Sequence, residues 1–237
     1  MPTTCLNAKR EVLISFDFSR DEWDALKSTY QQAGLIMKCC GAPAVPKTSR
    51  LGTQFFAHKN SECGEGHESL EHILCKQLVV KGARSAGWKA LPEEAGKDIE
   101  GNKWISDVLC SKGQRKVAFE IQLANQTFSE YKRRTAVYHK SKVRCLWLVR
   151  RTESLAILGQ MCRDKIESQG AVDPGRLPDR QDMPLFLVDV TDVGNIFVFF
   201  PWRLGCGPHQ IPLDLFIHGC LSGQLSFRGG LWRWSLA

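Results

Sequence analysis

Apolar and polar residues alternate along two neighbouring segments in the middle of the chain. Residues 104–110 and 116–123 have the period of two that is typical of β-strands. Residues 111–115, with Gly113 inside, have the composition of a turn. The pattern therefore predicts a β-hairpin.

The register of this hairpin decides where its acidic side chains lie. If the turn centres on Gly113 and Gln114, Asp107 is directly opposite Glu120, with Cβ atoms about 5 Å apart. Two carboxylates at that distance repel each other, so the pair is costly unless a cation lies between them. Mg²⁺ commonly binds one or two protein carboxylates together with water and substrate phosphate. Because Gln122 projects from the same face as Glu120, the three residues together predict a metal site.

An alternative interpretation is that the two acids are unrelated polar residues on a solvent-facing sheet surface, since such alternation is usual in antiparallel sheets. Against it, Ile105 and Ala118 share the face of Asp107 and Glu120, so that face is not generally polar. The metal-site interpretation is therefore the stronger one.

Other elements follow from periodicity and end signals. Two capping boxes predict helix starts, Ser19 with Glu22 and Thr127 with Glu130. In chain order we expect a strand at 11–18, helices at 19–32 and 67–81 (ending at Gly82), a polar loop at 92–102, the hairpin, a helix at 127–141, a buried strand at 143–149, a helix at 154–168, a loop at 169–183, strands at 185–190 and 195–200, and a helix at 213–221. The order predicts an α/β fold in which strand 143–149 is parallel to the strand of Glu120.

Composition indicates a globular chain without a predicted membrane segment. Its 237 residues suffice for one large domain or two small ones, and no apolar stretch approaches the roughly 20 residues that cross a bilayer. No secretory signal is visible at the N-terminus, so we expect a cytoplasmic location and no membrane partner. The ten cysteines are then expected to be thiols or metal ligands. The sequence does not specify the oligomeric state.

Basic residues gather directly after the predicted metal site. The formal net charge is only +7, but its distribution suits a polyanionic partner. The basic residues are Lys132, Arg133, Arg134, His139, Lys140, Lys142, Arg144, Arg150 and Arg151. Arg134 and Tyr138, one helical turn apart, are either phosphate contacts or an ordinary surface pair. A phosphate-binding surface beside a metal is what a nuclease requires, so nucleic acid is the expected partner.

Cys39, Cys40, His58 and Cys63 form a second candidate metal group within the loop-rich segment 35–66. Structural Zn²⁺ takes four Cys or His ligands, and a small segment gains folding stability from it. The adjacent cysteine pair departs from the usual two-residue spacer, since neighbouring side chains on an extended chain point apart.

Two interpretations of this segment stay open. Either only one of the adjacent cysteines binds zinc and His67 completes the set, or no metal binds and Phe55 and Phe56 form a small apolar core. Near the C-terminus, Trp232 and Trp234 fit a strand that packs into the core better than they fit base stacking.

The motifs, taken in order, resemble those of a nuclease family. Asp107, a spacer, and Glu120-x-Gln122 on the next strand resemble the PD-(D/E)xK superfamily, in the variant where Gln replaces the usual Lys. Residues 39 to about 150 resemble the competence-protein CoiA-like family. The matching pieces are Cys39-Cys40-Gly41, Gln54–Lys59, Glu68–His72, Ile105–Val108, Phe119–Gln122, Arg134-Thr135 with Tyr138, and Leu146–Leu148.

The resemblance implies a fold and a domain order. The fold is a restriction-endonuclease-like core, a mixed sheet flanked by helices, with a zinc-ribbon-like Cys/His module before it and an α+β extension after it. The expected domains are an N-terminal strand and helix (1–34), the Cys/His module (35–66), the nuclease core (67–151) and the C-terminal extension (152–237).

Glu68, His72 and Lys76 form one stripe on the helix that begins near residue 67. On pattern alone the stripe is a solvated face with intrahelical ion pairs. The resemblance implies instead that it is directed at the active site, with Glu68 as a metal or water ligand and His72 as a general base or orienting group. Glu71 is the second choice.

The resemblance also implies an activity, a Mg²⁺- or Mn²⁺-dependent deoxyribonuclease with Asp107 and Glu120 as ligands. Gln122 can position a water but brings no charge, so Lys76 or Arg134 is the candidate to supply it. Roles in DNA uptake, recombination or phage defence fit this activity. The alternative is a catalytically weak or inactive nucleic-acid-binding accessory protein with the same fold.

Overall fold

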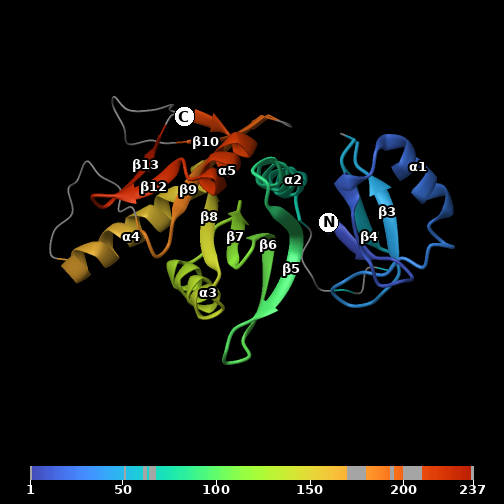
Figure 1. Cartoon of the computed structure of the whole chain (residues 1–237), viewed down its shortest axis with the longest axis horizontal. Helices are drawn as coiled ribbons and strands as arrows, with labels where there is room; N and C mark the ends of the chain where they lie inside the picture. The colour runs from blue at the N-terminus through green and yellow to red at the C-terminus, as the bar shows by residue number, and fades with distance from the viewer. Residues whose placement is uncertain are drawn as a thin grey trace. The chain divides into compact units, whose positions relative to one another are not determined.

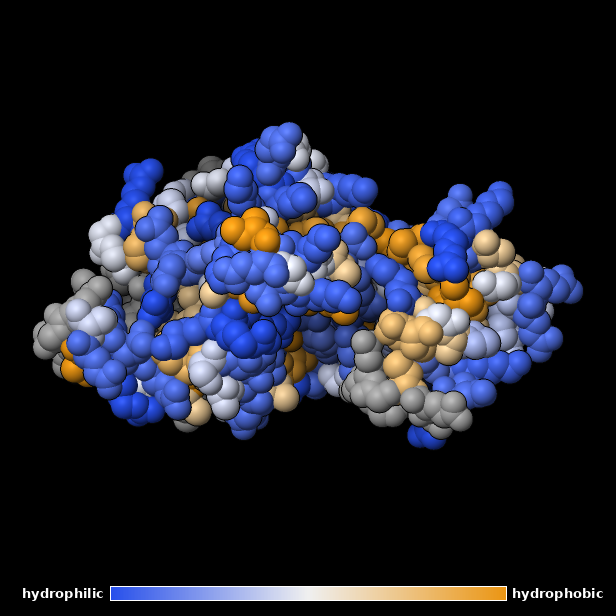
Figure 2. Space-filling view, turned by 90° about the horizontal axis from the view of Figure 1, so that it is seen from below, coloured by the Kyte–Doolittle hydropathy of each residue, from blue (hydrophilic) through white to orange (hydrophobic). Residues whose placement is uncertain are grey.

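The computed structural model describes residues 2–50, 52–60, 63, 68–169, 180–192, 195–199 and 210–235. The chain divides into two compact units, Met1–Gln77 and Leu78–Ala237. The division falls inside one continuous helix, α2 (Leu70–Ser85), which is described with the second unit. Within the described residues, no helix combines the length and apolar character that crossing a membrane requires. Hydrophilic residues cover most of the face seen in Figure 2.

The first unit is built from two small antiparallel sheets and one helix. Its elements are β1 (Thr4–Leu6), β2 (Val12–Ile14), the 3-10 helix η1 (Ser15–Asp17), α1 (Arg20–Thr29), β3 (Ala44–Thr48) and β4 (Gln54–His58). Trp23 of α1 packs edge-on against the fully buried Phe56, with ring centroids 5.1 Å apart. The Trp23 indole also donates to Thr48 Oγ1 at 3.1 Å, so the helix is fixed on the β3–β4 pair.

The sequence predictions for this unit are partly confirmed. Ser19 caps α1 in a complete capping box with Glu22, as predicted. The helix ends at Thr29, a few residues earlier than expected, and the predicted strand at 11–18 is shorter, because the chain turns into η1 after Ile14.

The second unit contains a mixed seven-stranded sheet in the order β11-β10-β9-β8-β7-β6-β5. The strands are β5 (Lys89–Lys97), β6 (Lys103–Lys112), β7 (Arg115–Gln122), β8 (Arg144–Arg150), β9 (Leu185–Asp192), β10 (Asn195–Phe199) and β11 (Gln210–Pro212). The pairs β7–β8 and β8–β9 are parallel, and the other neighbours are antiparallel. The mixed α/β class and the parallel β7–β8 pair are therefore confirmed, and β9–β11 continue the same sheet.

Helices cover both faces of this sheet (Figure 1). The remaining elements beside α2 are α3 (Phe128–Lys140), η2 (Arg151–Glu153), α4 (Ser154–Gln169), α5 (Leu213–Ser222), and the hairpin β12 (Leu225–Arg228) with β13 (Leu231–Trp234). Helices α3 and α4 share a buried cluster with Trp147 of β8. On the opposite face, Phe216 of α5 packs against Phe186 of β9 and stacks on Trp234. The buried Trp232 confirms that the C-terminal strand packs into a core.

Helix α2 continues through Gly82, where the sequence predicted its end. A Cβ at Gly82 would lie 2.2 Å from the backbone oxygen of Asp214 in α5. Around that close approach, Lys81 pairs with the Asp214 carboxylate at 2.6 Å, and Ser85 Oγ lies 2.9 Å from the His218 ring. The glycine therefore serves helix–helix contact, and the predicted helix end was wrong.

The predicted loop at 92–102 was also wrong, because most of it is strand β5. Pro92 lies on the edge strand of the sheet, where a missing N–H is tolerated. Gly96 makes room for the Trp104 ring, which would lie 2.1 Å from an added Cβ. The actual turn is short, and Asp98 Oδ1 accepts hydrogen bonds from the backbone N–H groups of Glu100 and Asn102, both at 2.9 Å.

Candidate metal and catalytic site

The hairpin β6–β7 has the turn and register that the sequence predicts. Its ladder extends from Lys112–Arg115 to Val108–Phe119, and the next pair in this register is Asp107 with Glu120. There the ladder stops, and the backbone N–H of Ile121 donates to Asp107 Oδ2 at 2.7 Å instead. A side chain thus replaces a ladder contact, which fixes the Asp107 carboxylate against β7.

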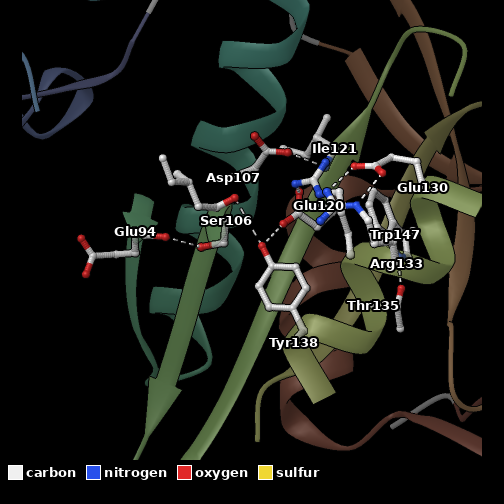
Figure 3. A network of polar contacts seen from close by, with 12 residues as sticks. Glu94, Ser106, Asp107, Glu120, Ile121, Glu130, Arg133, Thr135, Tyr138 and Trp147 are labelled. Atoms are coloured by element: carbon white, nitrogen blue, oxygen red, sulfur yellow. Dashed lines mark hydrogen bonds and ion pairs between the residues drawn. The ribbon is translucent and has the colours of Figure 1, made fainter. Parts of the chain in front are cut away.

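Glu120 is fully buried and is held by two donors from α3 (Figure 3). Arg134 Nη2 donates to one carboxylate oxygen at 2.5 Å, and the Tyr138 hydroxyl donates to the other. Arg134 lies over the Trp147 ring, 5.1 Å from its centroid. Trp147 in turn donates to Thr135 Oγ1 at 2.9 Å, so the group that holds Glu120 is itself fixed.

The electrostatics of this pair favour a bound positive charge. Burial, the largest cause, and the negative charge of Asp107 together raise the pKa of Glu120 to about 8, against the opposing effects of Arg134 and the Tyr138 hydroxyl. Near neutral pH the two acids therefore do not both ionise easily in isolation. A proton or a divalent cation between them relieves the repulsion.

The helical stripe forms an ion-paired group and is not a solvated face. Lys76 Nζ donates to both carboxylate oxygens of Glu68 at 2.7 Å, and its side chain is fully buried. His72 Nδ1 lies 3.4 Å from Glu68 Oε1. Ligand atoms of Glu68, His72 and Asp107 all lie within 4.8 Å of one another. Two carboxylates and an imidazole at this spacing are a donor set that a divalent metal can share.

Gln122 is partly exposed and lies two residues beyond Glu120 on β7. Its amide donates to the backbone oxygen of Ala124 at 2.9 Å. The side chain thus has a partner in the loop after the strand, while its carbonyl oxygen remains an acceptor that a water could use.

The residues of α3 predicted to bind nucleic acid have several different partners. Lys132 Nζ lies 3.1 Å from Asp164, and Arg133 makes a two-point contact with Glu130. That contact leaves the predicted capping box half formed, because only the Thr127 side chain caps the helix. Tyr138 is 1% exposed, so its ring has no surface for a nucleic acid. Sequence reasoning missed that Tyr138 and Arg134 hold Glu120.

In the first unit, Cys39, Cys40, His58 and Cys63 form one compact group, with ligand atoms all within 4.8 Å of one another. Cys39 Sγ lies 3.7 Å from Cys40 Sγ, 3.9 Å from Cys63 Sγ and 3.2 Å from His58 Nε2. The adjacent cysteines converge because they lie in a turn closed by Gly41, whose φ is +72° and whose N–H donates to Met37 O. The expectation that they point apart assumed an extended chain. His67 lies outside the described residues.

The carboxylate site lies within a segment that is similar to known nuclease-like domains. Residues 68–160 match the family described as competence protein CoiA, nuclease-like domain. The segment begins at Glu68 and includes the β6–β7 hairpin and α3, so the resemblance predicted from the motifs is confirmed there. No curated protein gives a significant match to the chain.

Proposed function

We propose, on the premise that residues 68–160 form a CoiA-like nuclease domain, that the protein is a metal-dependent nuclease that hydrolyses phosphodiester bonds of DNA. The observation that carries the proposal is the arrangement around Asp107. Its carboxylate is fixed on β7 beside the buried Glu120, and it shares a 4.8 Å cluster with Glu68 and His72. Oxygen and imidazole donors gathered in this way fit Mg²⁺ or Mn²⁺.

Each of these residues has a proposed role. Asp107 and, in place of the predicted Glu120, Glu68 would hold the ion, because Glu120 is not part of the group that Asp107 forms with Glu68 and His72. A bound ion would supply Lewis-acid polarisation of a phosphoryl oxygen and of a water. His72 accepts the proton of that water or orients it. Glu120 completes the acidic pair, and Arg134 offsets its charge. Gln122 positions the water through its amide oxygen.

Lys76 is the residue proposed to supply the positive charge that Gln122 lacks. Its ammonium group is buried, and both of its short contacts to Glu68 lie within the proposed ligand set. Arg134 is the weaker candidate because Glu120, to which its guanidinium is bound, is not part of the group that Glu68, His72 and Asp107 form.

A cleavage assay tests the proposal. Purified protein with Mg²⁺ or Mn²⁺ is expected to cut DNA. Asp107→Ala should reduce the rate at least about 100-fold, because losing only an outer-shell partner of a metal ligand already costs about 10- to 100-fold in metal affinity or activity and Asp107 is proposed as a direct ligand. Asp24→Ala on the exposed side of α1 is the matched control. If the wild type cuts no single- or double-stranded DNA or RNA with either metal, the enzymatic proposal fails.

A second candidate function, an accessory protein that binds nucleic acid without cutting it, is favoured by one observation. Gln122 brings no charge, and its amide is engaged by Ala124. Gln122→Lys separates the two functions, because it should raise the activity of a weak enzyme and leave an inactive one unchanged.

We propose in addition that Cys39, Cys40, His58 and Cys63 hold a structural Zn²⁺. Three thiols and one imidazole, with ligand atoms all within 4.8 Å of one another, are a donor set typical of structural zinc.

A further inference from the structure

Basic side chains gather at the end of the sheet where β6 turns into β7. Lys112 pairs directly with Arg115, and Arg144 of β8 pairs with Val117. Paired residues share a face, as do residues two apart on one strand, so the three basic side chains point to the same face. All three are exposed. Lys112, Arg115 and Arg144 are called the strand-end surface below.

Two buried tryptophans hold the arginines of this surface. The Arg115 guanidinium lies 5.1 Å from the centroid of the Trp88 ring, and the Arg144 guanidinium lies 5.3 Å from that of Trp232. Both indoles are at least nine-tenths buried, so they are rigid platforms. Stacking uses the face of a guanidinium and leaves its N–H edge available for another acceptor.

The arginines of α3 and of the strand-end surface differ in how their charge is used. Arg133 and Arg134 are paired with Glu130 and Glu120. Among the described residues, no acidic side chain pairs with Arg115 or Arg144. The surrounding sequence explains this, since segments 81–92, 108–119 and 142–152 contain no Asp or Glu. The same segments contain further basic residues, among them Arg84, Lys89, Lys116 and Lys142.

We propose that the strand-end surface binds the phosphate backbone of DNA at a place separate from the carboxylate site. Arg115 precedes Glu120 by five residues, which is about 17 Å along a strand, and an odd spacing puts the two side chains on opposite faces. A planar guanidinium with a free edge binds a phosphate through two parallel hydrogen bonds. Because the stacked side chains are already ordered, less entropy is lost on binding. The proposal rests on the proposed function in taking DNA as the substrate.

A salt series of binding measurements tests this proposal without cleavage. Fluorescence anisotropy with a labelled DNA duplex in EDTA gives the slope of log K against log salt concentration. Each phosphate contact contributes about 0.9 to that slope for duplex DNA. Arg115→Gln combined with Arg144→Gln should therefore weaken binding and make the slope shallower by about 1.8.

Matched variants separate the surface from general charge and from folding. Arg20→Gln combined with Arg163→Gln removes the same charge from exposed positions on α1 and α4 and should leave the slope unchanged. Arg115→Lys with Arg144→Lys keeps the charge and should keep the slope. If the double Gln variant folds poorly by circular dichroism, each single variant should show half the change.

The possible results distinguish this inference from the proposed function. The inference is overturned if the wild-type protein does not bind the duplex, or if the double variant keeps the wild-type slope. It stands if the slope falls as expected, even where the wild type cuts no nucleic acid with Mg²⁺ or Mn²⁺, in which case only the proposed function fails. If instead the wild type cuts DNA and the double variant keeps the wild-type slope, the proposed function stands and the strand-end surface is not a binding site.

Discussion

Replacing Glu120 with Gln should remove most of the pH dependence of stability in metal-free protein between about pH 4.5 and pH 8. The carboxyl is fully buried, and burial together with the charge of Asp107 raises its pKa from 4.5 to about 8. The folded state therefore binds the proton more tightly than the unfolded state. Stability from this group is fully present below pH 4.5 and is lost as the pH rises towards 8.

The magnitude follows from the size of the pKa difference. A rise from 4.5 to about 8 is about 3.5 units, and each unit corresponds to 1.36 kcal/mol. The upper bound on the loss of unfolding free energy is therefore about 5 kcal/mol. The Gln side chain cannot ionise, so the stability of Glu120→Gln should vary little with pH. Its N–H₂ group would face Arg134 and Tyr138, the donors that the carboxylate accepts from. The substitution should therefore lower stability by a nearly constant amount across the pH range.

Urea unfolding at pH 5, 6, 7 and 8 in EDTA measures the effect. The wild type should lose stability across this series, whereas Glu120→Gln should show a nearly flat profile. The control is Glu130→Gln, because Arg133 holds the pKa of Glu130 below its usual value, so its titration falls below the series. In a parallel series without EDTA, Mg²⁺ should restore stability at pH 8 in the wild type, since a cation bound at Asp107 offsets the negative charge that opposes ionisation of Glu120.

Either of two results would refute the raised pKa of Glu120 as the cause of the loss of stability between pH 5 and pH 8. One is a wild-type stability that stays constant or rises from pH 5 to pH 8. The other is a Glu120→Gln variant with the same slope as the wild type, which would show that another group titrates.

Three further predictions follow from the same structure. Gln122→Lys should raise the cleavage rate with little change in melting temperature, and an unchanged rate would mark the site as inactive. Cys39→Ser should reduce the zinc content of protein refolded with Zn²⁺ from one ion per chain to none by elemental analysis; retained zinc would contradict the proposed ligand set. Gly82→Ala should destabilise by about 2 kcal/mol or more, because its Cβ would lie 2.2 Å from Asp214 O. In Gly159→Ala of α4, where an added Cβ would meet only the end of the Arg163 side chain at 3.8 Å, a gain of up to about 1 kcal/mol is expected in chemical unfolding.

Local signals determined how well the fold could be predicted. The hairpin register followed from two strands of period two and a glycine turn, because all the information lies within about 20 residues of chain. Strand β5 was missed because Pro92 and Gly96 argue against a strand. Both residues are explained only by tertiary context. Pro92 is tolerated because β5 is an edge strand, and Gly96 leaves room for the Trp104 ring. Gly82 misled for the same reason, since it serves a contact with a helix about 130 residues later in the chain.

The residues of the candidate site likewise differ in whether the sequence alone could reveal their roles. Asp107 and Glu120 could be found from the sequence because acids on an otherwise apolar strand face are conspicuous. The roles of Arg134 and Tyr138 could not, because their spacing shows that they lie on one side of α3 but not which partner that side meets.

One signal for Tyr138 was nevertheless present in the sequence. The spacing of the buried residues on α3 is i, i+3, i+7 and i+10, at Phe128, Tyr131, Thr135 and Tyr138, which is the pattern of a core-facing stripe. A tyrosine on such a stripe needs a buried partner for its hydroxyl, and a buried acid on the neighbouring strand needs a donor. Each requirement is satisfied by the other, so the core of the second unit and its acidic site are specified together. A change in α3 packing should therefore alter the chemistry of Glu120 before it unfolds the protein.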